Sequence, residues 1–227
     1  MQLLFSSNMF RGVMDMRFIE ALSYSGADFL MKQKGENHEK RRIYYYGFQI
    51  VIGAIVKLLI LFILALITDT IVPAFLMSIA FASLRMLAGG YHMDTYGRCL
   101  ALSISMFIGF SIVARYTYSI FNAYQIVIFA VLTIVFSGFS LYKWAPSDNP
   151  NRPITELSEI NKFKRLSILY MIIWTLAATV LIYYKLYMIF LAIAFAVLLE
   201  VFSITPFGHK FFDGIKNVLD KVKNNIE

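Results

Sequence analysis

Six long apolar runs constrain this chain more than any other feature of its sequence. A helix needs roughly 17 to 25 residues to cross a bilayer, and every backbone polar group inside lipid must be hydrogen-bonded within the protein. The sequence therefore predicts an all-α integral membrane protein with six transmembrane helices, the third of them short. The runs lie at about 44–67, 71–88, 99–114, 120–141, 166–184 and 186–204.

The overall composition excludes the other broad classes of protein. Of the 227 residues, 59% are hydrophobic and only 15% are charged, which is far from the composition of a soluble domain. The chain also contains 21 Phe and 14 Tyr, too much apolar surface for a disordered protein in water. A soluble enzyme and a disordered segment are both excluded.

The positions of the basic residues predict the orientation in the membrane. Seven Lys and Arg precede the first apolar run, two lie at 85–98, five at 142–165 and four after 204. The other side has only Arg115 and Lys185, and Lys57 lies inside the first run. By the positive-inside rule, we expect a multi-pass membrane protein with both termini and the loops near 90 and 150 in the cytoplasm. This pattern explains the net charge of +7 without a nucleic-acid partner.

Both ends of the chain read as amphipathic segments that contact membrane lipids. In residues 1–43, the apolar side chains of Phe10, Met14, Phe18, Leu22 and Phe29 fall near one face of a helix, which either lies on the membrane surface or packs against the bundle. The tail at 205–227 has apolar residues at helical spacing among lysines, typical of a second interfacial helix. The expected parts are thus 1–43, the membrane domain at 44–204, and 205–227.

The chain has one cysteine, Cys99, and therefore no internal disulfide and no Cys-rich metal site. We expect neither a metal nor another cofactor. His92 lies seven residues before Cys99, and an imidazole is the side chain best suited to deprotonate a thiol near neutral pH. The alternative is that Cys99 only packs and His92 is only interfacial.

The spacing of these two residues requires a break in the helix. Seven residues of unbroken helix climb roughly 10 Å, too far for a hydrogen bond between the two side chains. Gly89, Gly90 and Gly97 supply the backbone freedom for such a break. If the third membrane helix begins near residue 98, Cys99 lies in its first turn, where the helix dipole favours a thiolate.

Three further charged residues have two readings each. Arg85 is either a topology anchor or a clamp for a substrate carboxylate or carbonyl, and Asp94 either orients His92 or is solvated. Lys57 either lines a cavity, because an ammonium is costly at that depth, or is paired with another group or snorkels toward the membrane surface.

The segment at 85–99 contains a motif made of Arg85, Gly89, Gly90, Tyr91, His92 and Cys99. This motif resembles the signature of a known family, the accessory gene regulator B family of bacterial membrane peptidases. A second match lies at 144–154, which is similar to the proline-rich basic segment that the family has between its fourth and fifth spans. Trp144 stands there in place of another aromatic such as Tyr, and the tail beyond 205 is longer than expected.

The resemblance implies a cysteine endopeptidase of bacterial quorum sensing. Its substrate would be a small propeptide with an amphipathic leader, an internal cysteine or serine and an acidic C-terminal tail. The enzyme would remove the tail and promote closure of a thiolactone or lactone ring. Cys99 would be the nucleophile and His92 its base, with Arg85 and Gly90 at supporting positions.

The sequence leaves rival functions open. A small membrane transporter or peptide exporter would use Lys57 and Glu200 in its pathway and leave Cys99 without a chemical role. A membrane receptor or scaffold would catalyse no covalent change at all. A homodimer is an option on general grounds, although no span has a convincing seam of small residues.

Overall fold

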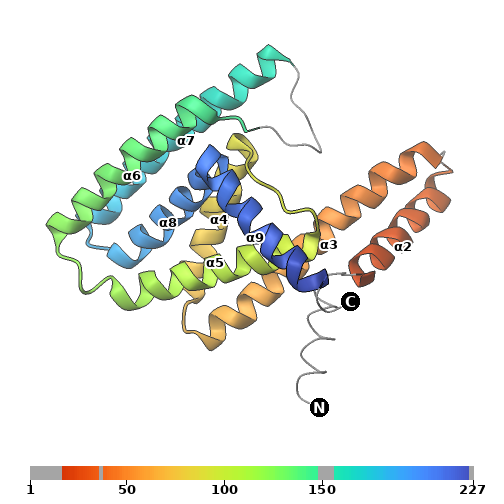
Figure 1. Ribbon diagram of the computed structural model, residues 1–227, viewed down its shortest axis with the longest axis horizontal. Coiled ribbons are helices and arrows are strands. Elements are labelled where there is room, and N and C mark those ends of the chain that lie inside the picture. The colour runs from red at the N-terminus through yellow and green to blue at the C-terminus, as the bar shows by residue number, and fades with distance from the viewer. Residues whose placement is uncertain (1–16, 36–37, 148–155, 225–227) are drawn as a thin grey trace. The chain divides into compact units, whose positions relative to one another are not determined.

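The computed structural model describes residues 17–35, 38–147 and 156–224, and within these ranges the regular structure is helical (Figure 1). Phe10 and Met14, expected on the amphipathic face of the N-terminal segment, lie outside the described residues. The helices are α2 (Arg17–Lys34), α3 (His38–Ile67), α4 (Ile71–Ala88), α5 (Tyr96–Thr117), α6 (Ala123–Trp144), α7 (Leu157–Tyr183), α8 (Tyr187–Ile204) and α9 (Pro206–Asn224).

Six of these helices, α3 to α8, are long and apolar enough to cross a membrane, which confirms the predicted all-α membrane fold. The predicted bounds match most closely for α4 and α8. The largest difference is at α7, which begins at Leu157 rather than near 166. Its first two turns are polar, with Lys162 and Lys164 among them, so hydropathy alone does not detect them although these residues favour helix.

The described residues form two compact units, and α3 and α5 each contribute to both. The first unit contains α2, the larger part of α3 up to Leu64, and Met93–Met106. Here α2 packs on α3: Gly26 leaves room for the Phe48 ring, which a Cβ at Gly26 would approach to 3.1 Å. Arg41 of α3 reaches Asp28 of α2 at 2.7 Å.

The predicted apolar face of the N-terminal segment does not make this contact. Phe18, Leu22 and Phe29 are exposed, whereas Ile19 and Ala27 of the same helix are buried. One face of α2 therefore fits packing against the protein, and another face fits contact with the membrane surface. The face with Ile19 and Ala27 packs on the protein, and the side chains of Phe18, Leu22 and Phe29 remain available for lipid.

The second unit contains Ala65–His92 and the described residues from Phe107 onward, and α8 lies at its centre (Figure 1). This helix packs against α4, α6, α7 and α9. Because it has protein on most sides, α8 is apolar nearly all round, as expected for a central helix. Phe190 of α8 is fully buried, with its ring centroid 6.3 Å from those of Phe129 and Trp174.

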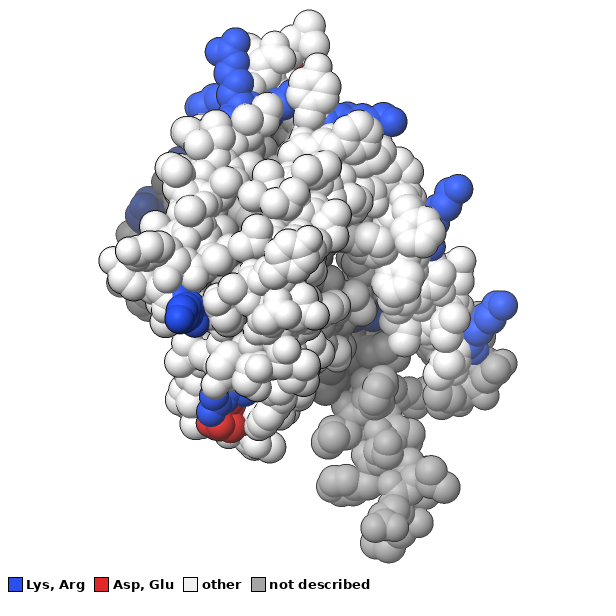
Figure 2. All heavy atoms as spheres, turned by 90° about the vertical axis from the view of Figure 1, so that its left-hand side faces the viewer, with Lys and Arg blue, Asp and Glu red and all other residues white. Residues whose placement is uncertain are grey.

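The outer faces of α6 and α7 expose large apolar side chains. Leu132 and Val135 on α6 are more than half exposed, as is Leu176 on α7. Figure 2 shows a face dominated by uncharged side chains, with Lys and Arg only at isolated points. Such a surface is stable in contact with lipid and would not be stable in water.

Two adjacent alanines of α7 test this distinction between core and lipid face. Ala178 is buried in the hydrophobic core, and Ala177 is exposed. We expect Ala178→Leu to lower the free energy of unfolding by about 1–3 kcal/mol, because overpacking forces neighbouring side chains out of position. Ala177→Leu should have little effect. Thermal unfolding in lipid nanodiscs measures both, and equal melting temperatures for the two variants would contradict the assigned core.

Candidate functional site

The break after α4 occurs where the sequence predicts it. The helix ends at Ala88 because Gly89 and Gly90 have φ angles of 77° and 131°, which favour glycine over residues with a side chain. Non-helical chain then continues until α5 begins at Tyr96. The expectation for Gly97 is wrong: this residue lies inside the first turn of α5 and does not contribute to the break.

The segment after α4 contacts the second of the two motifs noted in the sequence. The amide of Ser147 donates a hydrogen bond of 2.7 Å to the carbonyl of Ala88, and Gly89 forms an isolated β-bridge with Ser147. A Cβ at Gly89 would collide with the Ser147 carbonyl. The two motifs, more than fifty residues apart in the chain, therefore lie side by side. The remainder of the second motif, 148–154, is outside the described residues.

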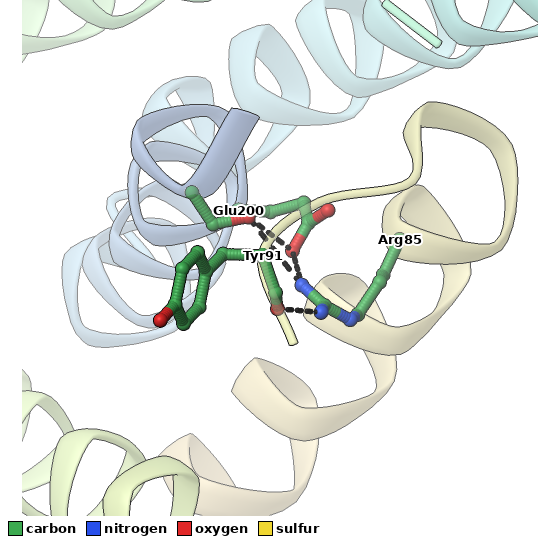
Figure 3. A network of polar contacts seen from close by, with 4 residues as sticks. Arg85, Tyr91 and Glu200 are labelled. Atoms are coloured by element: carbon green, nitrogen blue, oxygen red, sulfur yellow. Dashed lines mark hydrogen bonds and ion pairs between the residues drawn. The ribbon is translucent and has the colours of Figure 1, made fainter. Parts of the chain in front are cut away.

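Arg85 is at the centre of a polar cluster between α4 and α8. Its Nη1 lies 3.1 Å from Glu200 Oε2 and 3.4 Å from Ser203 Oγ. Its Nη2 donates to the carbonyl of Tyr91, as Figure 3 shows. The Glu200 side chain is fully buried. Arg85 thus joins two membrane helices to the segment that follows α4. Its supporting role and the substrate-clamp reading both stay predictions.

Gly90 lies against this cluster. A Cβ at Gly90 would be 2.5 Å from Ser203 Oγ, 2.8 Å from Arg85 Nη1 and 3.0 Å from Glu200 Oε1. The absence of a side chain therefore allows the backbone to approach the ion pair. Within the described part of the chain, Glu200 Oε1 makes no hydrogen bond, so this carboxylate oxygen is the least satisfied atom of the cluster.

Tyr91, the residue before His92, has both its backbone amide and its backbone carbonyl in hydrogen bonds. The Tyr91 amide donates to the Ser203 carbonyl at 3.3 Å, and the Tyr91 carbonyl accepts from Arg85. The His92 side chain is exposed on one side, but the protein around it still lowers its pKa below the ordinary value of 6.5, first by partial burial and then through the positive charge of Arg85. At neutral pH the imidazole is uncharged, which is the form that can accept a proton.

Cys99 lies in the first turn of α5, as predicted. Thr95 caps this helix, since its Oγ1 accepts from the Arg98 amide at 3.4 Å and its carbonyl accepts from the Cys99 amide at 3.1 Å. The Tyr96 hydroxyl donates to the Gly53 carbonyl, which attaches the start of α5 to α3. The thiol is free and partly exposed.

The two residues of the predicted dyad belong to different units. His92 is the last residue of its segment of the second unit, and Cys99 lies in the first. The catalytic pairing of these residues therefore stays a prediction. The same holds for Asp94, which lies in the non-helical segment between them.

A cleft of about 460 Å³ lies beside the contact between the two motifs. Its lining combines Trp144, Pro146 and Ser147 with Ile204, Pro206 and His209 of the α8–α9 junction. Its walls are polar and apolar in nearly equal parts. In the described ranges, His, Cys, Asp and Glu side chains form no group of three or more that could hold a metal ion.

Gly90→Ala tests the close approach to the ion pair. The added methyl group would displace Ser203 or Arg85 and would require an unfavourable φ, so we expect a loss of about 1–3 kcal/mol in the free energy of unfolding. Gly138→Ala is the matched control, because nothing lies within 4 Å of a Cβ at that helical position. Thermal unfolding in nanodiscs compares them; equal stability would mean that Gly90 does not touch the cluster.

The ion pair itself predicts a non-additive double mutant. Glu200→Leu leaves Arg85 without its buried partner, and breaking a buried pair costs about 3–5 kcal/mol. We expect Arg85→Met combined with Glu200→Leu to be more stable than Glu200→Leu alone, because no isolated charge remains. The same unfolding assay measures this, and strictly additive losses would refute the coupling.

Comparison with known proteins agrees with this arrangement. The chain is 26% identical over 172 residues to an AgrB-like protein of Clostridium perfringens (strain SM101 / Type A), a match that covers 74% of this chain and 80% of the relative. It is 24% identical over 213 residues to AgrB-like protein 2 of Clostridium perfringens (strain 13 / Type A), covering 90% and 99%. The name of each relative states only a likeness to AgrB. No solved structure matches.

The family model for accessory gene regulator B matches residues 23–204, which is most of the chain and includes both motifs. The chain therefore belongs to this family.

Proposed function

We propose that the chain is a membrane cysteine endopeptidase that removes the C-terminal tail of a small quorum-sensing propeptide and promotes its cyclisation. The observation that carries the proposal is the environment of His92. Burial and Arg85 lower its pKa, and the neighbouring Tyr91 backbone is held by Arg85 and Ser203. A positioned, uncharged imidazole is what a general base requires. Membership of the accessory gene regulator B family supports the same role.

In this mechanism, His92 takes the proton of the Cys99 thiol, and the thiolate attacks the carbonyl carbon before the acidic tail. The imidazolium then protonates the departing amine as the C–N bond breaks, which leaves a thioester on Cys99. An internal thiol of the substrate attacks this thioester and releases the Cys99 thiol, giving a thiolactone; a hydroxyl would give a lactone. Arg85 and Gly90 would keep the segment before His92 in position.

Ring closure competes with hydrolysis. Exchange of one thioester for another is nearly balanced in free energy, whereas hydrolysis is downhill, so the site must hold the internal thiol close and limit water. The mixed polar and apolar walls of the cleft beside Ser147 suit an amphipathic leader, and they are contributed by both the second motif and the α8–α9 junction.

We also propose that both termini and the segment after α4 lie in the cytoplasm. Six spans require both termini on the same side, and the predominance of Lys and Arg there favours the cytoplasmic side. The start of α7 adds a basic cleft, lined in part by Lys162 and Arg165, that could attract the acidic tail of the substrate.

Mass spectrometry of cells that co-express the chain with the short reading frame beside its gene tests the reaction. We expect a released C-terminal tail and an N-terminal product one water lighter than the linear fragment. Both should disappear in Cys99→Ala and in His92→Ala, while Ser103→Ala, one turn further along α5, should retain them. Cleavage that survives in Cys99→Ala would remove this residue from the mechanism. Uncleaved propeptide with all variants would favour a transporter.

The pH dependence of tail removal tests the role of His92 separately. The free base is the active form, and its pKa lies below 6.5. The rate should therefore fall toward acid pH with a midpoint below 6.5. Rates in nanodiscs with a synthetic propeptide measure the acid limb. A midpoint above pH 6.5 would contradict the assignment.

A further inference from the structure

The tail helix α9 makes contacts that neither the family match nor the proposed chemistry explains. It begins at Pro206, beyond the matched residues, and one face of its first two turns meets Tyr91 of the motif. We infer that α9 holds the segment after α4 through Tyr91 and thereby positions His92. The effect on catalysis rests on the proposed function, whereas the hold of α9 on Tyr91 does not.

Three residues of α9 contact the Tyr91 side chain. The Phe212 ring stacks on the Tyr91 ring with centroids 5.2 Å apart and planes at 25°. His209 meets the same ring edge-on at 5.5 Å, and Asp213 accepts the hydroxyl hydrogen bond at 2.8 Å. Positions 209, 212 and 213 lie on one face of a helix, so a single surface of α9 grips both the ring and its hydroxyl.

The helix that makes these contacts is itself fixed to α8. Thr205 caps it: its Oγ1 accepts from the Gly208 amide at 3.0 Å, and Pro206 takes the first helical position, where no amide is needed. Gly208 lies so close to the Phe202 carbonyl that a Cβ would collide with it. The Phe202 ring contacts the rings of three α9 residues, Phe207, Phe211 and Phe212, with centroids 5.6–5.9 Å apart.

Tyr91 is thus held from three directions. Ser203 accepts from its amide, Arg85 donates to its carbonyl, and α9 holds its side chain. The next residue in the chain is His92. Without α9, the Tyr91 side chain would lose its ring contacts with His209 and Phe212 and its hydrogen bond to Asp213. Tyr91 and Phe212 are therefore positioning residues, which act on the reaction only through the placement of His92.

The remainder of α9 provides a matched control. Val218 lies on the same helix, is 60% exposed and follows the last of the three Tyr91-contacting residues by more than one helical turn. Val218→Ala removes apolar surface from α9, and thus affinity for lipid, without touching the contact with the motif. An effect of Phe212→Ala that Val218→Ala lacks therefore reports the Tyr91 contact and not general attachment of the tail to the membrane.

The experiment measures hydrogen exchange and turnover on the full chain in lipid nanodiscs. We expect Phe212→Ala to raise the exchange rates of the Tyr91 and His92 amides by on the order of tenfold. It should lower kcat for a synthetic propeptide by on the order of 10-fold to 100-fold at nearly constant KM. Val218→Ala should change neither quantity. Tyr91→Phe keeps the stacked ring and loses only the Asp213 hydrogen bond, so its effects should be smaller.

The outcomes separate the two proposals. Unchanged exchange at Tyr91 and His92 in Phe212→Ala would overturn the inference whatever the activity, as would raised exchange with unchanged kcat in an active protein. Raised exchange in a protein whose wild type processes no propeptide would support the hold of α9 on Tyr91 and refute the proposed function. If Phe212→Ala does not fold, Phe212→Leu, which keeps apolar volume but loses the stacked ring, decides the same question with the same readouts.

Discussion

The ion pair between Arg85 and Glu200 is the interaction on which the arrangement around the motif depends. Charges that leave water must find a partner, and here the partners come from α4 and α8, 115 residues apart in the chain. The pair fixes these two helices at one end of the second unit. Arg85 also bonds the Tyr91 carbonyl, so the same guanidinium sets the path of the chain after α4. A buried pair adds little net stability, but it strongly disfavours other registers of α4 on α8.

A break in a membrane helix exposes backbone groups that lipid cannot satisfy, and this requirement explains the surroundings of Gly89 and Gly90. The carbonyl of Ala88 is paired with the Ser147 amide, and the Tyr91 amide with the Ser203 carbonyl. Both partners come from other helix ends of the same unit. The proximity of the two motifs thus follows from hydrogen bonding: the second motif completes the backbone pairing that the first leaves open.

Sequence reasoning succeeded where the signal is local. Hydropathy located the six spans, and paired glycines located the end of α4, because each depends on residues adjacent in the chain. It failed where two distant segments meet. The pairing of Glu200 with Arg85 could have been inferred only from the fact that both lie near the C-terminal ends of even-numbered spans, which run in the same direction. The prediction that Gly97 contributes to the helix break was wrong because glycine is tolerated in a first helical turn as well as in a loop.

The aromatic face of α9 shows why an amphipathic pattern does not determine what the face contacts. Phe211 and Val218 have the spacing of an interfacial helix, and the sequence predicts that they contact lipid. In the structure Phe212 is buried against Tyr91 and Phe202, while Phe211 and Val218 remain exposed. The apolar surface is therefore divided between protein and membrane. Because the family match ends at residue 204, the motif residue Tyr91 is held by a segment outside the matched region. The placement of His92 in this chain then depends on contacts that its family motif alone does not encode.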